Sequence, residues 1–172
     1  MNIKCIKTGF LEENCYLIEK NNKYLVIDPG SDFDKIKENI KGEVLGILIT
    51  HRHFDHIGAL DDMVNEYKVP VYEKANLTET NYKIRDFNFE VIFTSGHTKD
   101  SITFHFPKQK LMFTGDFIFF NNIGRCDLDT GCFEDMKKSI EKIKKYDDNT
   151  IIYPGHGIKT TLLREKEKNI YF

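Results

Sequence analysis

Three histidines and one aspartate fall between positions 51 and 56, immediately after a near-continuous apolar run. The run, Val44–Ile49, is typical of a strand that is covered on both faces. The histidine-rich loop, Thr50–Gly58, is followed by an amphipathic pattern that predicts a helix to about Tyr67. Loops rich in His and Asp at strand ends favour a fold in which sheets are flanked by helices.

The spacing within this loop predicts a metal site. His51 and His53 are two residues apart, so an extended backbone points both side chains to one side. Asp55 and His56 fall where the loop turns into the helix and can address a second position, while Gly58 allows a close approach. Imidazole and carboxylate ligands suit zinc, iron or manganese. The alternative is a polar loop with unrelated histidines, which the clustering of three of the six histidines disfavours.

Two further histidines and one aspartate lie in glycine-marked turns after apolar runs. His97 follows Gly96, and His156 stands between Gly155 and Gly157. Asp116 follows Gly115 in the same strand-to-loop position. Each alone would be an ordinary turn residue. Together with the cluster, we interpret the histidines as projecting into a shared cleft, with Asp116 as the carboxylate that bridges two cations.

Other polar residues receive different interpretations. His105 lies between Phe104 and Phe106, which indicates a packed or surface strand histidine rather than a ligand. Cys15 is flanked by strand residues and is expected in the core. Asp28 either holds a metal-ligating imidazole or forms a turn before Pro29, and the sequence leaves both interpretations open.

The remaining segments predict alternating strands and helices. Ser31 is expected to cap a helix over Phe33–Lys41 that Gly42 ends. A tight hairpin is expected at Asn21-Asn22, and Glu73–Asp86 has no assignable pattern. The other expected strands are Ile3–Lys7, Cys15–Glu19, Tyr24–Asp28, Val69–Tyr72, Phe89–Thr94, Ser101–Phe106, Lys110–Thr114 and Thr150–Tyr153. The other expected helices are Phe133–Tyr146 and one beginning near Thr161.

Composition narrows the class of protein. The 172 residues fit one domain, 1–172, with 40% hydrophobic and 30% charged residues. A net charge of −2 gives no general attraction to nucleic acid or to anionic membranes. The N-terminus lacks the apolar stretch of a signal peptide, and four cysteines without CxxC spacing are expected to stay reduced. We therefore expect a cytoplasmic protein.

Taken together, these motifs resemble the metallo-β-lactamase superfamily and, within it, the small glyoxalase II-like members. The resemblance runs through nearly the whole chain: Asn14-Cys15-Tyr16, Asp28-Pro29-Gly30, the HxHxDH set at His51–His56, Ser95-Gly96-His97-Thr98 with Ser101, Gly115-Asp116, Gly124-Arg125-Cys126-Asp127, Pro154-Gly155-His156-Gly157, and Thr160-Thr161-Leu162 to Glu165 with Asn169. It implies an α+β fold, a four-layer αββα sandwich with the site at one edge.

The resemblance also implies the ligand sets and the chemistry. His51, His53 and His97 would hold one metal ion, and Asp55, His56 and His156 would hold the other. Asp116 would bridge two divalent ions, with zinc favoured and iron or manganese as alternatives. The implied reaction is hydrolysis of an acyl thioester or related ester by a metal-bound hydroxide. Asp55 would orient the hydroxide and handle its proton, and Arg125 would stand near the substrate.

Several alternatives remain open at this point. A single iron on the same fold would make a persulfide dioxygenase, since His and Asp also bind iron well. A related nuclease is disfavoured by the near-neutral charge, and a metal-binding module without catalysis by the complete ligand set. Antibiotic hydrolysis would normally accompany an export signal.

The chain departs from the family pattern in three places, which leave the substrate undetermined. The segment before His97 is short. Thr98-Lys99-Asp100-Ser101 stands where the family usually has Pro-Gly. Glyoxalase II uses a helical domain after the last ligand histidine to grip glutathione, and here sixteen residues follow His156. We therefore expect weak affinity for S-lactoylglutathione and tolerance of other thiol carriers.

Overall fold

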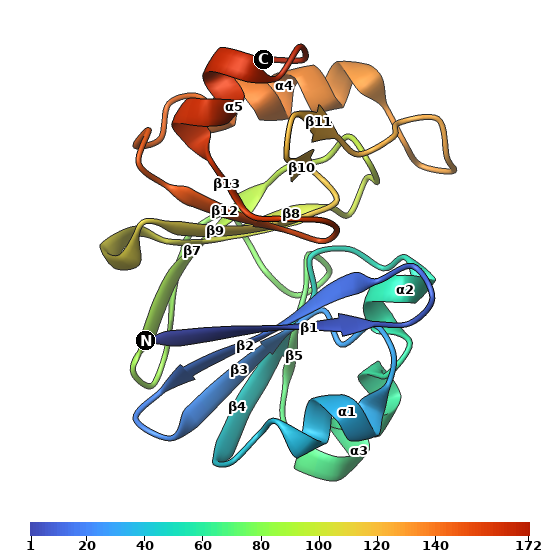
Figure 1. The fold of residues 1–172 in the computed structure, drawn as a ribbon, viewed down its shortest axis with the longest axis vertical. Helices are drawn as coiled ribbons and strands as arrows, with labels where there is room; N and C mark the ends of the chain where they lie inside the picture. Colours follow the sequence, from blue (N-terminus) through green and yellow to red (C-terminus); the bar gives the residue numbers. More distant parts are fainter.

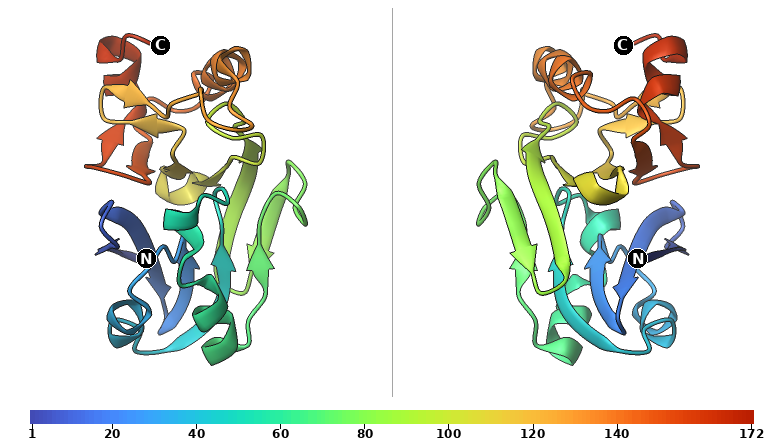
Figure 2. Two further views of the ribbon diagram at one scale, coloured as in Figure 1. Left: turned by 90° about the vertical axis from the view of Figure 1, so that its right-hand side faces the viewer. Right: turned by 90° about the vertical axis from the view of Figure 1, so that its left-hand side faces the viewer.

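Two β-sheets face each other between two layers of helices in the computed structural model, which describes residues 1–172 (Figure 1). The first sheet has the strand order β1-β2-β3-β4-β5, and the second has the order β13-β12-β9-β8-β7-β6. Figure 2 shows the same layers from the sides, with the N-terminal half below and the C-terminal half above. The α+β class and the four-layer αββα arrangement are therefore as expected.

The first sheet comes from the N-terminal part of the chain. Its strands are β1 (Asn2–Thr8), β2 (Glu13–Lys20), β3 (Lys23–Ile27), β4 (Glu43–Leu48) and β5 (Val71–Tyr72). β1, β2 and β3 are antiparallel neighbours, whereas β3, β4 and β5 run parallel. The predicted hairpin between β2 and β3 is confirmed, with Asn21 and Asn22 at φ 54° and 60°, values that suit a tight two-residue turn.

The second sheet comes from the C-terminal part. Its strands are β6 (Asn81–Ile84), β7 (Phe87–Phe93), β8 (Ile102–Phe106), β9 (Leu111–Gly115), β12 (Ile151–Pro154) and β13 (Thr160–Thr161). A 3-10 turn, η1 (Pro107–Gln109), joins β8 and β9, and β9 pairs with β12 in parallel. A separate ribbon is formed by β10 (Ile118–Phe119) and β11 (Asn122–Ile123).

The helices cover the outer faces. Three lie on the side of the first sheet: α1 (Phe33–Glu38), α2 (Phe54–Ile57) and α3 (Leu60–Tyr67). Two lie over the second sheet: α4 (Phe133–Ile143) and α5 (Leu162–Lys168). None of these helices has the length and apolar character that crossing a membrane requires.

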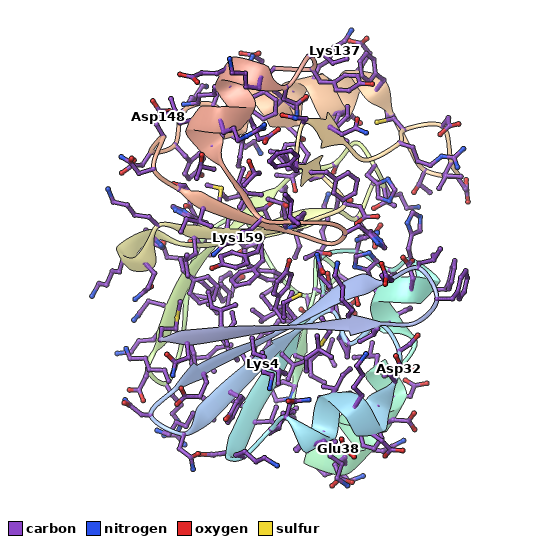
Figure 3. All side chains as sticks on the ribbon, in the orientation of Figure 1. Lys4, Asp32, Glu38, Lys137, Asp148 and Lys159 are labelled. Carbon is purple, nitrogen blue, oxygen red and sulfur yellow. The ribbon has the colours of Figure 1, made fainter.

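The alternation of side chains along the strands explains the layering. In β3, Leu25 and Ile27 join the core between the sheets, while Tyr24 and Val26 join the core under α1 and α3. Such a strand is apolar on both faces. A third core, which includes Met112 of β9, packs under α4 and α5. Figure 3 shows side chains filling the space between the sheets, whereas the labelled Glu38 and Lys137 lie in opposite outer layers.

The first helix is shorter than predicted. It begins after Asp32 and ends at Glu38, so Ser31 is not its cap. The Ser31 N–H instead donates to Thr8 Oγ1 and ties this residue to β1. Gly42 does not end the helix either: a Cβ there would lie 2.0 Å from Asn22 O, so the glycine permits close contact with the β2–β3 hairpin.

Several other boundaries also differ from the prediction. The helix expected after the histidine-rich loop is divided into α2 and α3, and α4 ends at Ile143 rather than Tyr146. Glu73–Asp86 contains β6, which pairs with β7. Two-residue strands such as β10, β11 and β13 are too short to produce a periodic pattern. The last helix, α5, begins where expected near Thr161, which caps it: Thr161 Oγ1 accepts from Arg164 N.

Candidate metal centre

The seven predicted ligand residues converge where strand ends of both sheets meet. His51 follows β4 of the first sheet, and the other members of the HxHxDH set lie at the start of α2. His97 follows β7, Asp116 follows β9 directly, and His156 follows β12, all from the second sheet. Residues separated by about a hundred positions in the sequence are therefore neighbours, as the predicted shared cleft requires.

One set of ligand candidates, here called the imidazole group, consists of His51, His53 and His97. His53 Nδ1 lies 3.2 Å from His51 Nε2 and 2.9 Å from His97 Nε2. Zinc–nitrogen bonds of about 2.0–2.1 Å in a tetrahedron would separate such nitrogens by roughly 3.3 Å. The three nitrogens are therefore spaced as ligands of one small cation.

The second set, here called the mixed group, consists of Asp55, His56 and His156. Asp55 Oδ2 lies 3.1 Å from His156 Nε2 and 3.8 Å from His56 Nε2. His56 is fully buried, whereas about a quarter of the His156 side chain, 27%, is exposed. One carboxylate and two imidazoles thus face a common point that solvent can reach from one side.

Asp116 lies between the two groups. Its Oδ1 is 3.3 Å from His56 Nε2, and its Oδ2 is 3.6 Å from both His97 Nε2 and His156 Nε2. His56 Nε2 and Asp116 Oδ1 are buried without a hydrogen-bond partner, despite their proximity. Leaving such atoms unpaired costs about 1–3 kcal/mol each. A cation near both atoms would satisfy them, so the donor set fits two metal ions.

Asp28 orients one histidine of each group. The Nδ1 of His56 donates to Asp28 Oδ2 over 3.0 Å, and the Thr50 hydroxyl donates to the same oxygen over 2.6 Å. Because that hydroxyl proton is used, Thr50 Oγ1 accepts from His51 Nδ1 at 3.1 Å. Both rings then present an unprotonated Nε2 to the centre, which is the form that binds metal. The interpretation of Asp28 as the holder of an imidazole is favoured.

Backbone carbonyls orient two more rings. His97 Nδ1 lies 2.7 Å from Arg125 O, and His156 Nδ1 lies 3.2 Å from Leu11 O. A carbonyl can only accept, so each ring keeps its proton on Nδ1 and turns Nε2 inward. His53 differs, because its Nδ1 faces the other two nitrogens of the imidazole group.

The local electrostatics differ between the groups. Burial, followed by the neighbouring histidines, lowers the pKa of His51 well below its usual value, and burial and His97 lower the pKa of His53. Burial alone would lower the pKa of His156, but its hydrogen bond to Asp55 raises it. Burial would raise the pKa of Asp116, but His56 and other histidines lower it. The Asp116 carboxylate is therefore ionised.

Glu13 is a buried polar residue that the sequence reasoning missed. Its Oε2 accepts from Thr8 Oγ1, while its Oε1 has no partner and lies 3.8 Å from His56 Nδ1. Burial raises the pKa of Glu13 well above the usual range. The available signal was a glutamate at the start of a strand with an apolar centre, directly before the Asn14-Cys15-Tyr16 motif.

Glycines make the close approaches at the centre possible. A Cβ on Gly155 would lie 2.2 Å from Asp116 Oδ1 and 2.6 Å from His56 Cε1. The predicted close approach at Gly58 is confirmed, because a Cβ there would lie 2.2 Å from Gly30 O. A larger residue at either position would therefore displace neighbouring atoms of the site.

The centre opens into a cavity of about 640 Å³. Arg125 lines this cavity, but its guanidinium forms two hydrogen bonds to Asp127, over 2.7 and 2.8 Å. Its role toward substrate remains a prediction. The lining residues are Leu11, His53, Phe54, Asp55, His97, Asp116, Phe119, Gly124, Arg125, Leu128, Asp129 and His156.

Two residues expected to lie outside the chemistry do so. His105 is buried in β8, where its Nδ1 lies 2.9 Å from Glu90 Oε2, and Tyr146 donates to the other Glu90 oxygen. Cys15 is completely buried in the core under α1 and α3. Neither contacts the predicted ligands, so both interpretations are confirmed.

Comparisons with known proteins agree with this geometry. The chain is 31% identical to a probable metallo-hydrolase of Bacillus subtilis, covering 98% of this chain and 96% of that protein. It is 31% identical to a hydroxyacylglutathione hydrolase of Haemophilus influenzae, covering 98% and 97%. Among solved structures, the BLEG-1 B3 metallo-β-lactamase is 30% identical with a TM-score of 0.93, covering 99% of both chains.

A further solved structure concerns the metal. The protein TTHA1623, solved in a di-iron-bound form, is 27% identical with a TM-score of 0.90, covering 98% of this chain and 100% of that one. The family model of the metallo-β-lactamase superfamily matches residues 8–81 and 81–156. The chain therefore belongs to the metallo-β-lactamase superfamily.

Proposed function

We propose that the chain is a metal-dependent hydrolase that cleaves acyl thioesters or related esters at a binuclear centre. The observation that carries the proposal is the position of Asp116: its Oδ1 lies 3.3 Å from His56, and its Oδ2 lies 3.6 Å from both His97 of the imidazole group and His156 of the mixed group. Relatives named as a probable metallo-hydrolase and a hydroxyacylglutathione hydrolase support the reaction class.

The proposed metal ligands are divided between the two groups. The imidazole group would hold one divalent ion and the mixed group the other, while Asp116 would touch both. When bound, such ions supply a nucleophilic hydroxide near neutral pH, with a water pKa of about 7, and polarise the acyl carbonyl. Zinc is favoured by the imidazole-rich ligands, and the di-iron form of TTHA1623 makes iron the main alternative.

Asp55 is the proposed proton-handling residue. It lines the cavity, and one of its oxygens contacts His156 Nε2 at 3.1 Å. Burial would raise the pKa of Asp55, but the hydrogen bond to His156 and the neighbouring His56 lower it. The carboxylate is thus ionised at neutral pH and can accept a proton from the attacking water. It would then return that proton to the departing thiol or alcohol.

A persulfide dioxygenase with one iron is the alternative reaction on this fold. Such an enzyme needs only one set of ligands, so the residues of the mixed group would not be required to bind metal. Four groups of that second position, Asp55, His56, His156 and the shared Asp116, point to one place. Their convergence favours the binuclear hydrolase.

The decisive test is turnover with acyl thioesters, measured on samples whose metal content is known. Protein loaded with zinc, iron or manganese is assayed with one acyl group on several thiol carriers, before and after chelation. We expect hydrolysis that disappears on chelation and returns on repletion. Oxygen consumption with a persulfide substrate, without thioester cleavage, would instead support the dioxygenase.

A further inference from the structure

An aromatic pair lies exposed beside the cavity: Phe54 lines it, and Phe10, which is outside the lining, stacks on Phe54. Phe10 belongs to the turn between β1 and β2 and is 84% exposed, and Phe54 is the first residue of α2 and is 66% exposed. Their rings are stacked, with centroids 6.4 Å apart and planes at 20°. The β1–β2 turn and α2 lie side by side at the right of Figure 1.

The pair continues as an apolar wall into the cavity. Phe54 lines the cavity together with Leu11 and Phe119. Phe119 also reaches the centre itself, because its ring centroid is 6.1 Å from that of His156. The same turn that carries Phe10 supplies the Leu11 carbonyl that orients His156. The apolar wall thus extends from the solvent to the reacting groups.

The side of the lining formed by Gly124, Arg125, Leu128 and Asp129 offers no free cation. Arg125 is the only lysine or arginine among the lining residues, and Asp127 already binds its guanidinium through two hydrogen bonds. Asp129, also in the lining, adds a further carboxylate. An amide-bearing, uncharged carrier suits this side, whereas an anionic carrier would meet no unpaired positive side chain.

A protein partner is a poor occupant for the apolar wall. A large apolar side chain contributes about 200 Å² of surface, and three or four partly covered ones fall short of the roughly 800 Å² per partner that a standard interface buries. Continuity with the metal centre favours a small molecule that occupies the wall and the centre together.

Building on the proposed thioesterase function, we propose that the Phe10–Phe54 wall binds the apolar acyl chain of the substrate. The carbonyl then sits at the centre, and an uncharged thiol carrier extends along Gly124–Asp129. The preferred substrate is therefore an acyl thioester with a hydrocarbon chain of several carbons, rather than a short hydroxyacyl group on an anionic carrier. In the reaction, water adds oxygen to the acyl carbon, the carbon–sulfur bond breaks, and the thiol leaves with the proton.

The hydrophobic effect sets the size of the expected preference. Burial of one methylene corresponds to roughly a four-fold change in an equilibrium or rate ratio. The wall is partly open, so we expect about two- to four-fold in kcat/KM per added methylene, until the chain passes the two rings. From acetyl to hexanoyl this becomes at least about ten-fold.

The first test uses the metal-loaded protein and thioesters of N-acetylcysteamine, an uncharged carrier. Values of kcat/KM are compared for acetyl, butyryl and hexanoyl groups, and lactoyl groups are compared on N-acetylcysteamine and on glutathione. We expect a rise with chain length and a preference for the uncharged carrier. A flat or falling series, or a preference for glutathione, would overturn the inference.

Variants assign the effect to the wall. Phe10→Ala and Phe54→Ala should reduce the ratio of hexanoyl to acetyl kcat/KM by about three-fold or more. Ile170→Ala removes another exposed apolar side chain, 85% exposed and outside the cavity, and should leave the ratio unchanged. Metal content is measured for each, since Phe54 adjoins His53 and Asp55. An unchanged ratio in Phe10→Ala would contradict the role of the wall.

A binding measurement separates this inference from the proposed reaction. Calorimetry compares hexanoate with acetate on the metal-loaded protein, and the longer carboxylate should bind at least about ten-fold more tightly. If no thioester is hydrolysed but hexanoate binds more tightly in a Phe10-dependent way, the proposed reaction fails and the wall stands. If thioesters of every chain length are hydrolysed equally and the two carboxylates bind alike, the reaction stands and the wall fails.

Discussion

The two halves of the candidate centre differ in what surrounds them. The imidazole group consists of three histidines, and burial, followed by the neighbouring histidines, keeps the pKa values of His51 and His53 low. The mixed group contains a carboxylate, and its His156 has a raised pKa because of the hydrogen bond to Asp55, despite burial. The first half thus consists of imidazoles alone, whereas the second contains a carboxylate.

The difference indicates how the fold divides the work between the halves. The imidazole group needs external charge to balance a cation, and within contact distance only Asp116 provides it. Both groups reach the cavity, through His53 and His97 on one side and through Asp55 and His156 on the other. Only the mixed group has a carboxylate of its own, which is why Asp55 is the proposed proton-handling residue. Two carboxylates connect the halves. Asp116 lies between the two proposed metal positions, and Asp28 contacts the Nδ1 side of His56 directly and that of His51 through Thr50.

Removal of the connecting carboxylate should have the largest effect. In Asp116→Ala the charge shared by both halves is lost, so we expect turnover to fall by more than about a hundred-fold and metal content to fall in both groups. Ser95→Ala and Ser101→Ala, in the turn that carries His97, should lose much less. Retention of most turnover and metal in Asp116→Ala would remove the bridging role.

A matched pair of variants separates the halves. His53→Ala and His156→Ala each remove a partly exposed imidazole, so neither leaves a large buried void. Each should reduce metal binding from two equivalents to one, and spectroscopy of the cobalt-substituted protein should differ between the two because different ligands remain. Identical spectra in both variants would mean that a single metal position depends on all the histidines.

A smaller effect on metal affinity is expected from Asp28, which orients the ligand histidines without belonging to the predicted ligand set. Asp28→Asn removes the charge that orients His56 directly and His51 through Thr50. Loss of such a partner typically weakens metal affinity or activity by 10–100-fold, and here both equivalents should be weakened. Asp61→Asn, at an exposed position, is the control. Weakening of one equivalent alone would show that the Thr50 connection to His51 is not used.

The smallest effect is expected at the sixth histidine. His105→Gln breaks the contact with Glu90 in β8 and should cost about 1 kcal/mol of unfolding free energy, measured by denaturant titration. Metal stoichiometry should stay at the wild-type value, because His105 contacts none of the predicted ligands. A variant that binds one metal fewer would show that the ligand set is wrong.

Much of the centre could be predicted because its signals are local or family-wide. The HxHxDH spacing is readable from six residues, and the glycine-marked turns after apolar runs indicated His97, Asp116 and His156, which the fold brings together. The groups that orient the histidine rings have no recognisable pattern in the sequence. The carbonyls of Leu11 and Arg125 accept from His156 and His97, and any residue type provides a carbonyl.

The strands and helices were predictable where the pattern of apolar residues extended over several positions. Strands with several apolar residues, such as β4 and β8, were found close to their bounds, whereas the two-residue strands β10, β11 and β13 were not. Ser31 is a favourable helix cap by type, but its N–H is used by Thr8 in β1. Glu13 was missed for a similar reason, since its burial depends on α2 and Gly30 packing over it.

Metal stoichiometry tests the central claim most directly. Metal-free protein is titrated with zinc and with iron under anaerobic conditions, and bound metal is measured by elemental analysis alongside protein concentration. The arrangement of both groups around Asp116 predicts saturation at two equivalents, with both lost on chelation. Saturation at one equivalent, unaffected by His156→Ala, would contradict the binuclear centre.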